Sequence, residues 1–184
     1  SVAFAAVGGT QAPILIAGFN TLRSDLGTTT QTNRPLITFG AQTGALGTNW
    51  DIYNLSMTGT GTPVLTLGGN SKIVNSKIAN TSITAARIAV TLANQSVLLA
   101  SEVLSYRGNA LSLGSNSAVV ASSYIHDSDK GFTTSSTGSE IMLIGNIFAG
   151  NVTNAIATSS TQIGRLLLLG NTIYGAENKL GTCV

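Results

Sequence analysis

Charged residues that could act together in catalysis gather at one place in the sequence, the run His126-Asp127-Ser128-Asp129-Lys130. His126 and Asp127 could form an acid–base pair, and Asp127 with Asp129 could supply oxygen ligands to a cation. The same residue types also collect in ordinary solvated turns between strands, where they carry no chemistry. The solvated turn is the favoured interpretation, and His126, Asp127 and Asp129 remain the only catalytic candidates.

Other signatures of catalysis or cofactor binding do not occur in the sequence. It has no Ser/His/Asp order, no Cys/His spacing for a metal and no phosphate-binding loop, so neither a cofactor nor a metal is predicted. A net charge of +2 without any basic run argues against a nucleic-acid partner. Apolar runs stay below the roughly 18 residues that a spanning helix needs, so no membrane span is predicted. The single cysteine, Cys183, excludes an internal disulfide.

A short pattern that repeats along the chain indicates the elements that must position these side chains. The pattern is an apolar residue, two further positions, a small polar residue, one further position and a second apolar residue. Clear copies are Ile73–Ile78, Leu143–Phe148 and Leu168–Ile173, and looser copies begin at residues 52, 98 and 119. The separations of 21 to 25 residues are typical of a solenoid, in which each repeat is one rung. A short segment with alternating apolar and polar residues precedes each copy, as expected of a half-buried strand.

Residues 1–34 allow two interpretations within a single domain that spans residues 1–184. Leu15, Phe19, Leu22 and Leu26 have the spacing of an amphipathic helix, which would cap the regular rungs of residues 35–184. Alternatively, Ala17–Leu22 is a further copy of the pattern, and Ala3–Ala5 is the strand that precedes it. The second interpretation, a first rung, is favoured because it keeps the order of strand and pattern.

The repeat resembles the rungs of the right-handed parallel β-helices of the pectate-lyase-like superfamily, which often read apolar-x-x-Asn-x-apolar. Leu143–Phe148 and Leu168–Ile173 carry this resemblance, which extends over residues 35–184 at least. It implies an all-β fold, a right-handed parallel β-helix of about six to seven rungs of 21–25 residues. The superfamily contains lyases, glycosidases, phage tailspikes and adhesins, so the resemblance implies no single activity.

Alignment of the copies groups residues into columns that run from rung to rung. Two columns are expected to be buried and one to form a polar hydrogen-bonded ladder. Charges agree with the alignment, because Asp51 falls beside Lys72 and Lys77 beside Glu102 in neighbouring rungs. The buried columns are Ile52/Ile73/Leu98/Val119/Leu143/Leu168 and Met57/Ile78/Val103/Tyr124/Phe148/Ile173, and the ladder is Ser76/Ser101/Ser122/Asn146/Asn171.

Two further columns are expected to point outward. The first consists of small hydroxyl residues and is either a solvated ladder or a flat surface for a subunit, a sugar or ice. The second is apolar, and exposed apolar columns usually mark an interface, unless a neighbouring segment covers them. The hydroxyl column is Thr38, Thr66, Thr91, Ser112, Thr133 and Ala157, and the apolar column is Tyr53, Val74, Leu99, Val120, Ile144 and Leu169.

These features predict a non-enzymatic structural or adhesive β-helix of a virion tail or cell-surface protein. The apolar column predicts a homo-oligomer or contact with another part of a longer parent chain, and the hydroxyl column leaves a polysaccharide partner open. An extracellular or virion-surface location follows from this class. The alternative is a carbohydrate-active enzyme with acids at Asp127 and Asp129, and an ice-binding role comes third because the hydroxyl column is single.

Overall fold

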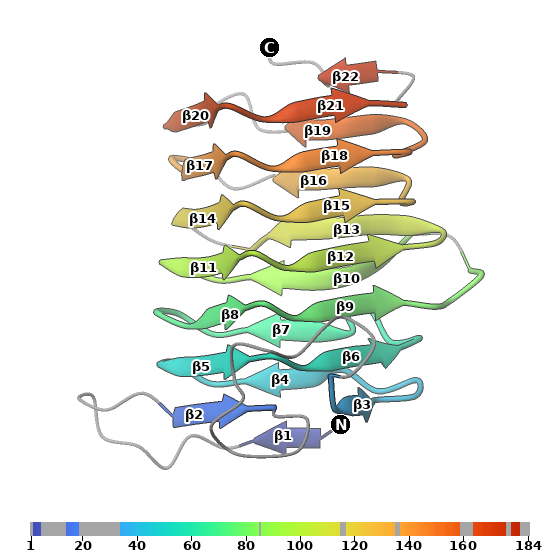
Figure 1. Cartoon of the computed structure of the whole chain (residues 1–184), viewed down its shortest axis with the longest axis vertical. Coiled ribbons are helices and arrows are strands. Elements are labelled where there is room, and N and C mark those ends of the chain that lie inside the picture. Colours follow the sequence, from blue (N-terminus) through green and yellow to red (C-terminus); the bar gives the residue numbers. More distant parts are fainter. Residues whose placement is uncertain are drawn as a thin grey trace.

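The computed structural model describes residues 2–4, 14–18, 34–84, 86–114, 117–134, 137–158, 164–175 and 178–180. Within these ranges every regular element is a β-strand, and the strands form three parallel sheets, here called A, B and C (Figure 1). Sheet A consists of β1 (Val2–Phe4), β4 (Gly44–Leu46), β7 (Leu65–Leu67), β10 (Arg87–Leu92), β13 (Gly108–Leu113), β16 (Lys130–Thr134), β19 (Asn154–Thr158) and β22 (Asn178–Leu180).

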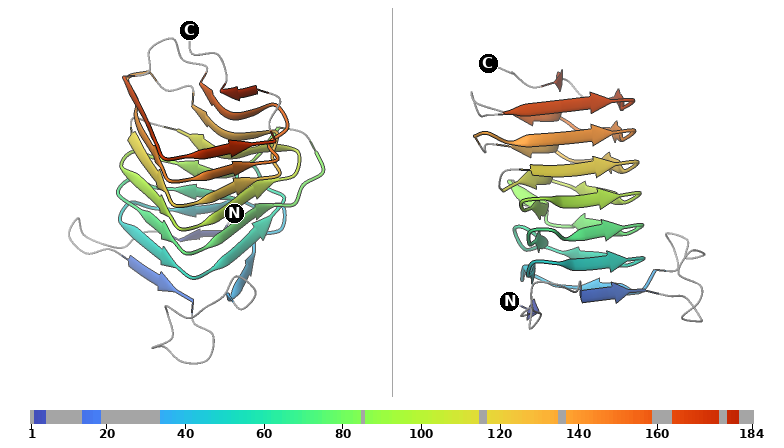
Figure 2. Two further views of the ribbon diagram at one scale, coloured as in Figure 1. Left: turned by 45° about the horizontal axis from the view of Figure 1, so that its top comes forward. Right: turned by 90° about the vertical axis from the view of Figure 1, so that its left-hand side faces the viewer.

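Sheets B and C contain the other two strands of each turn. Sheet B consists of β2 (Ile14–Ala17), β5 (Trp50–Tyr53), β8 (Lys72–Val74), β11 (Ser96–Leu99), β14 (Ser117–Ala121), β17 (Glu140–Ile144) and β20 (Arg165–Leu169). Sheet C consists of β3 (Leu36–Thr38), β6 (Ser56–Gly59), β9 (Lys77–Asn80), β12 (Glu102–Ser105), β15 (Tyr124–His126), β18 (Ile147–Ala149) and β21 (Thr172–Tyr174). Figure 2 shows the successive turns stacked above one another, which confirms the predicted all-β parallel solenoid.

The core is built from inward columns in which like stacks on like. Each strand alternates inward and outward side chains, so every turn adds its inward apolar residues to the same continuous interior. Burying one such side chain fully contributes about 1.5–3 kcal/mol before conformational entropy is subtracted. The column of sheet B is Ile52, Ile73, Leu98, Val120, Leu143 and Leu168, and that of sheet C is Met57, Ile78, Val103, Ile125, Phe148 and Ile173.

These columns match the predicted ones except in the fourth copy, where the sequence register was wrong by one residue. Val120, not Val119, lies in the inward column of sheet B, and Ile125, not Tyr124, lies in that of sheet C. The stretch offers an acceptable residue in both registers, with two adjacent valines and an apolar Tyr124 beside Ile125. A shift of one residue moves every side chain to the opposite face, and only three-dimensional packing selects between the two.

The polar ladder follows the bend between sheets B and C. The residue before each ladder position has a positive φ, as at Asn75 (47°) and Ala100 (48°), and this left-handed conformation turns the chain from one sheet into the next. The backbone N–H of Ser76 donates to Oγ of Ser101 at 3.1 Å, and the N–H of Ser101 donates to Oγ of Ser123 at 3.1 Å. The predicted ladder is therefore confirmed, with Ser123 in place of Ser122.

The first strands belong to the solenoid. β1 pairs in parallel with β4, and β2 pairs in parallel with β5. This pairing agrees with the favoured first rung, but Ile16 rather than Ala17 lies beside Ile52 in the inward column. The alternative helix is wrong at Leu15, which lies in a strand, and its other residues (Phe19, Leu22, Leu26) are outside the described ranges, as are residues 19–22 of the proposed pattern copy.

Candidate functional site

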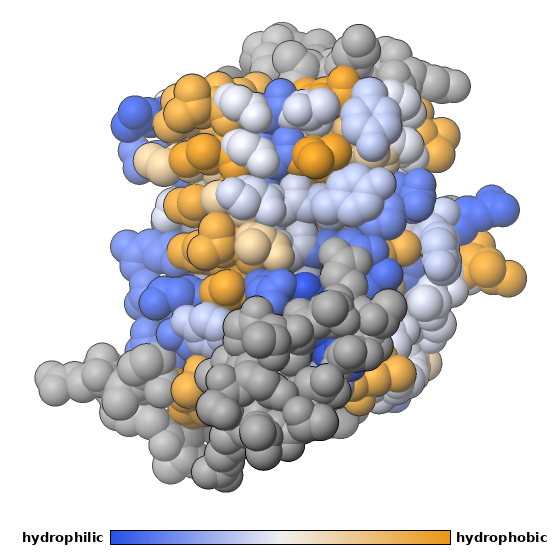
Figure 3. Space-filling view, viewed as in Figure 1, coloured by the Kyte–Doolittle hydropathy of each residue, from blue (hydrophilic) through white to orange (hydrophobic). Residues whose placement is uncertain are grey.

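The outer surface of sheet B carries a continuous set of apolar side chains. Two outward columns, together called the apolar face, run along it and are half-buried or exposed, with Leu99 at 38% and Leu169 at 58% exposure. Figure 3 shows hydrophobic residues gathered over β11, β14, β17 and β20. The columns are Val97/Val119/Met142/Leu167 and Val74/Leu99/Ala121/Ile144/Leu169.

The predicted interface column coincides with the second of these columns, with one correction. Tyr53 continues this column in β5, and Val74, Leu99, Ile144 and Leu169 pair in register beside it. Val120 is wrong, because it is completely buried in the core, and Ala121 takes its place. The cause is the register shift of the fourth copy described above.

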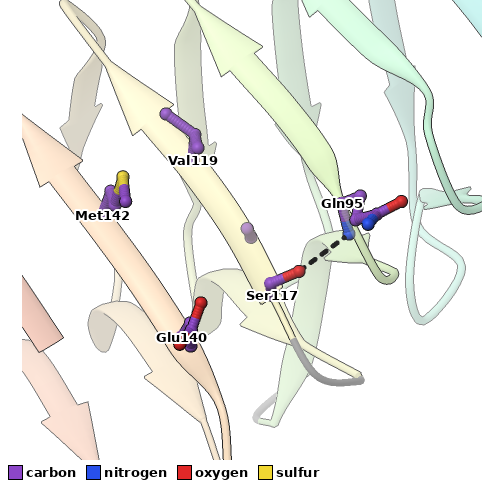
Figure 4. A pocket seen from close by; sticks show the side chains of 6 residues that line it. Gln95, Ser117, Val119, Glu140 and Met142 are labelled. Carbon is purple, nitrogen blue, oxygen red and sulfur yellow. Dashed lines mark hydrogen bonds between the residues drawn. The ribbon is translucent and has the colours of Figure 1, made fainter. Parts of the chain in front are cut away.

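Val97 and Val119 form part of the apolar face but were missed by the sequence reasoning. The signal that could have found them is alternation, because both neighbours of the inward Leu98 must point outward in a strand. A shallow depression of about 210 Å³ lies on this part of the surface and is lined by Gln95, Ser117, Ala118, Val119, Glu140 and Met142 (Figure 4). Its lining residues come from β14 and β17, together with Gln95 just before β11.

The hydroxyl column lies on the outer surface of sheet A and is shorter than predicted. Thr66, Thr91, Ser112 and Thr133 pair in register and are half-buried. Thr38 does not belong to the column, because β3 lies in sheet C and pairs with β6. The sheet A strand of that turn is β4, where Ala45, not Thr38, pairs with Thr66. The remaining four hydroxyls make a single row without a second row beside it.

The chemistry-bearing residues meet on the outer surface of sheet C, in a set called the His126 cluster. His126 lies at the end of β15, with Nε2 3.1 Å from Oε1 of Glu102 and Nδ1 2.8 Å from Oδ2 of Asp127. Nζ of Lys77 donates to the same Oε1 of Glu102 at 2.7 Å. The ring of Tyr124 stacks on the imidazole with centroids 4.0 Å apart. The predicted pairing of Lys77 with Glu102 is confirmed, and so is that of Asp51 with Lys72 at 3.6 Å.

The charge state of the His126 cluster follows from its contacts. Both ring nitrogens of His126 face carboxylates, and only the doubly protonated imidazolium can donate to both. Burial acts to lower the pKa of His126, but its hydrogen bonds to Glu102 and Asp127 and their charges outweigh burial and raise this pKa. The hydrogen bond from His126 lowers the pKa of Glu102 to about 2, against the opposing effect of burial and with help from Lys77.

This arrangement brings together only part of the predicted catalytic set. His126 and Asp127 are in contact as proposed, but Asp129 is engaged elsewhere, since its Oδ1 accepts a hydrogen bond from Oγ1 of Thr153 at 2.8 Å. Asp127 is the exposed member, with 64% of its side chain accessible, whereas the side chain of His126 is 11% accessible. The interpretation of residues 126–130 as a solvated turn is therefore wrong for His126, which is buried in a strand.

Among the described residues, no group of three or more His, Cys, Asp or Glu side chains is arranged to hold a metal ion. The same residues contain no helix of the length and hydropathy needed to cross a membrane. Comparisons of the chain with protein-family models, with curated proteins and with solved structures find no match.

Proposed function

We propose that this chain is a non-enzymatic structural or adhesive β-solenoid of a virion tail or cell-surface protein, acting outside the cell or on the virion. It is a rigid stack that binds a protein partner through the apolar face. The resemblance of its polar ladder to apolar-x-x-Asn-x-apolar rungs supports a right-handed helix of the pectate-lyase-like type. The ladder residues Asn146 and Asn171 carry this resemblance.

The single observation that supports the binding role is the composition of the apolar face. Nine apolar side chains occupy outward positions on five consecutive strands, from β8 to β20. Outward positions of a solvated strand normally carry polar residues, and a continuous apolar patch normally marks a contact surface. An opposing surface would remove these side chains from water at a gain of about 25 cal/mol per Å² of apolar area.

Light scattering on a size-exclusion column, over a range of protein concentrations, tests this role. We expect an oligomer that dissociates on dilution, and a Leu99→Ser variant whose Kd is about tenfold higher because an apolar contact becomes polar. The matched control is Ile83→Ser, which changes an 85% exposed apolar residue in the segment between β9 and β10. A wild-type protein that stays monomeric, or two variants that behave alike, would contradict the proposal.

A second candidate function, polysaccharide cleavage, is favoured by the contact of His126 with Asp127 and Glu102. An exposed carboxylate beside a histidine could serve as an acid–base pair on a glycan. Cleavage of members of a broad glycan panel, lost in an Asp127→Ala/Asp129→Ala variant, would support this activity. No cleavage by the wild-type protein would count against it. An ice-binding role is not proposed, because the hydroxyl column is a single row.

A further inference from the structure

We propose that the apolar face binds the same face of a second copy of this chain, with the two solenoid axes antiparallel. The inference rests on the proposed function, because it names the partner of that face. It depends on the order of charges along sheet B, which is independent of the apolar composition.

The outward positions of sheet B carry charges only near their two ends. In the order of the turns these are Asp51 on β5, Lys72 on β8, Glu140 on β17 and Arg165 on β20. The described outward positions of β11 and β14 between them carry none. From β5 to β20 the sequence of signs is therefore minus, plus, none, none, minus, plus, and β2, the first strand of the sheet, adds no charge because its outward residues are Leu15 and Ala17. Read in the opposite direction it becomes plus, minus, none, none, plus, minus, so every charge is replaced by its opposite.

This order selects one orientation of a symmetric pair. A two-fold axis between β11 and β14, parallel to the strands, places β8 opposite β17 of the second copy and β5 opposite β20. Lys72 then lies opposite Met142, two positions along β17 from Glu140, and Asp51 lies opposite Leu167, two positions along β20 from Arg165. A parallel arrangement, turn facing the same turn, would instead oppose like charges, which is unfavourable at an interface. Lys72 is half exposed and Glu140 is exposed, so both can reach across, whereas Asp51 is buried and pairs with Lys72 at 3.6 Å within its own chain.

The middle of the face is suited to the same arrangement. Val97 and Leu99 on β11 face Val119 and Ala121, respectively, of the second copy. In the second pair the larger Leu99 meets the smaller Ala121. Gln95 and Ser117 both line the depression, and the backbone N–H of Gln95 donates to Oγ of Ser117 at 3.3 Å (Figure 4). Packed sheets lie about 10 Å apart, and Lys and Glu side chains can span this gap at the ends.

Charge-reversal variants test the charge order. Lys72→Glu and Glu140→Lys each turn two facing pairs of the dimer from attraction to repulsion, and we expect each to raise the dimer Kd by about tenfold. The double variant restores opposite charges and should return Kd to within about threefold of the wild-type value. Thermal melts of each variant show whether the fold itself is intact, since Lys72 also pairs with Asp51 within the chain. A double variant no tighter than the single ones would overturn the inference.

Cysteine cross-linking tests the orientation in a Cys183→Ser background. We expect an oxidised disulfide dimer when Val97→Cys and Val119→Cys proteins are mixed, and none with either protein alone. A dimer formed by Val97→Cys alone or Val119→Cys alone would overturn the proposed axis, and so would a trimer by light scattering. A protein that is monomeric throughout would contradict both the inference and the proposed function. An oligomer whose Kd is raised by Leu99→Ser but is unchanged by the charge-reversal variants would overturn the inference and leave the proposed function standing.

Discussion

Replacing one serine of the polar ladder by alanine tests how the solenoid holds its inner bend. In Ser101→Ala, the buried N–H of Ser76 loses the Oγ acceptor that it contacts at 3.1 Å. The carbonyl of Leu99, to which Oγ of Ser101 donates at 2.8 Å, still accepts the N–H of Asn75 at 3.0 Å. The substitution therefore leaves one buried donor without a partner, and removes little packing volume.

An unpaired buried N–H costs about 1–3 kcal/mol, so we expect the free energy of unfolding of Ser101→Ala to fall by that amount. For a chain of this size the melting temperature would fall by about 2–12 °C. The assay is urea and thermal unfolding followed by circular dichroism.

The matched control is Ser112→Ala, which removes the same hydroxyl from a half-buried outward position of sheet A. We expect it to change the free energy of unfolding by less than about 0.5 kcal/mol. Equal effects of the two substitutions would refute the argument that the ladder satisfies buried backbone groups.

Three further predictions concern the backbone, the His126 cluster and the core. Ala100 is a non-glycine residue at φ 48°, so Ala100→Gly should raise the free energy of unfolding in urea by about 0.5–1 kcal/mol. Gly170 lies at φ 63° with open space around it, so Gly170→Ala should lower that free energy by about 1 kcal/mol. Changes of the opposite sign would contradict the left-handed bend. The stability that His126 contributes is present below its unfolded pKa near 6.5 and is lost as the pH rises through its raised folded pKa. The stability that Glu102 contributes is present above its unfolded pKa of about 4.5 and is lost as the pH falls toward its folded pKa of about 2. Unfolding at a series of pH values should therefore show maximal stability between about pH 4.5 and 6.5. His126→Gln should flatten the alkaline side of that profile, and an unchanged profile would exclude the imidazolium bridge. Phe132→Ala should lower the free energy of unfolding by about 3–5 kcal/mol because Phe132 is fully buried, and a loss below about 1 kcal/mol would contradict its place in the core.

The fold was predictable because the same alternation of apolar and polar residues recurs in every repeat of the solenoid. A single apolar-polar alternation is ambiguous, but copies at 21 to 25 residues agree on which residues stack, as Ile73 on Leu98 and Ile78 on Val103 show. Charge pairing supplied an independent check, because a wrong register would have separated Lys77 from Glu102.

The errors arose where neighbouring residues satisfy the pattern equally well. At Val119-Val120, both residues are β-branched and apolar, so the sequence has no means of choosing the inward one. The His126 cluster was only half predicted for a different reason. Contact of His126 with Glu102 depends on the register of β12 against β15, and the pattern had already assigned Glu102 to a pair with Lys77. A carboxylate oxygen can accept from two donors, which sequence pairing does not anticipate.

The backbone N–H groups of the polar ladder donate in one direction along the stack. Each buried N–H donates to a side chain of the turn that comes after it, as Ser76 does to Ser101 and Ser123 does to Asn146. A ribosome releases the earlier turn first, so that turn remains incomplete until its successor arrives and supplies the acceptor. Each turn thus supplies the acceptor for the buried N–H of the turn before it, and its own buried N–H needs an acceptor from the turn after it.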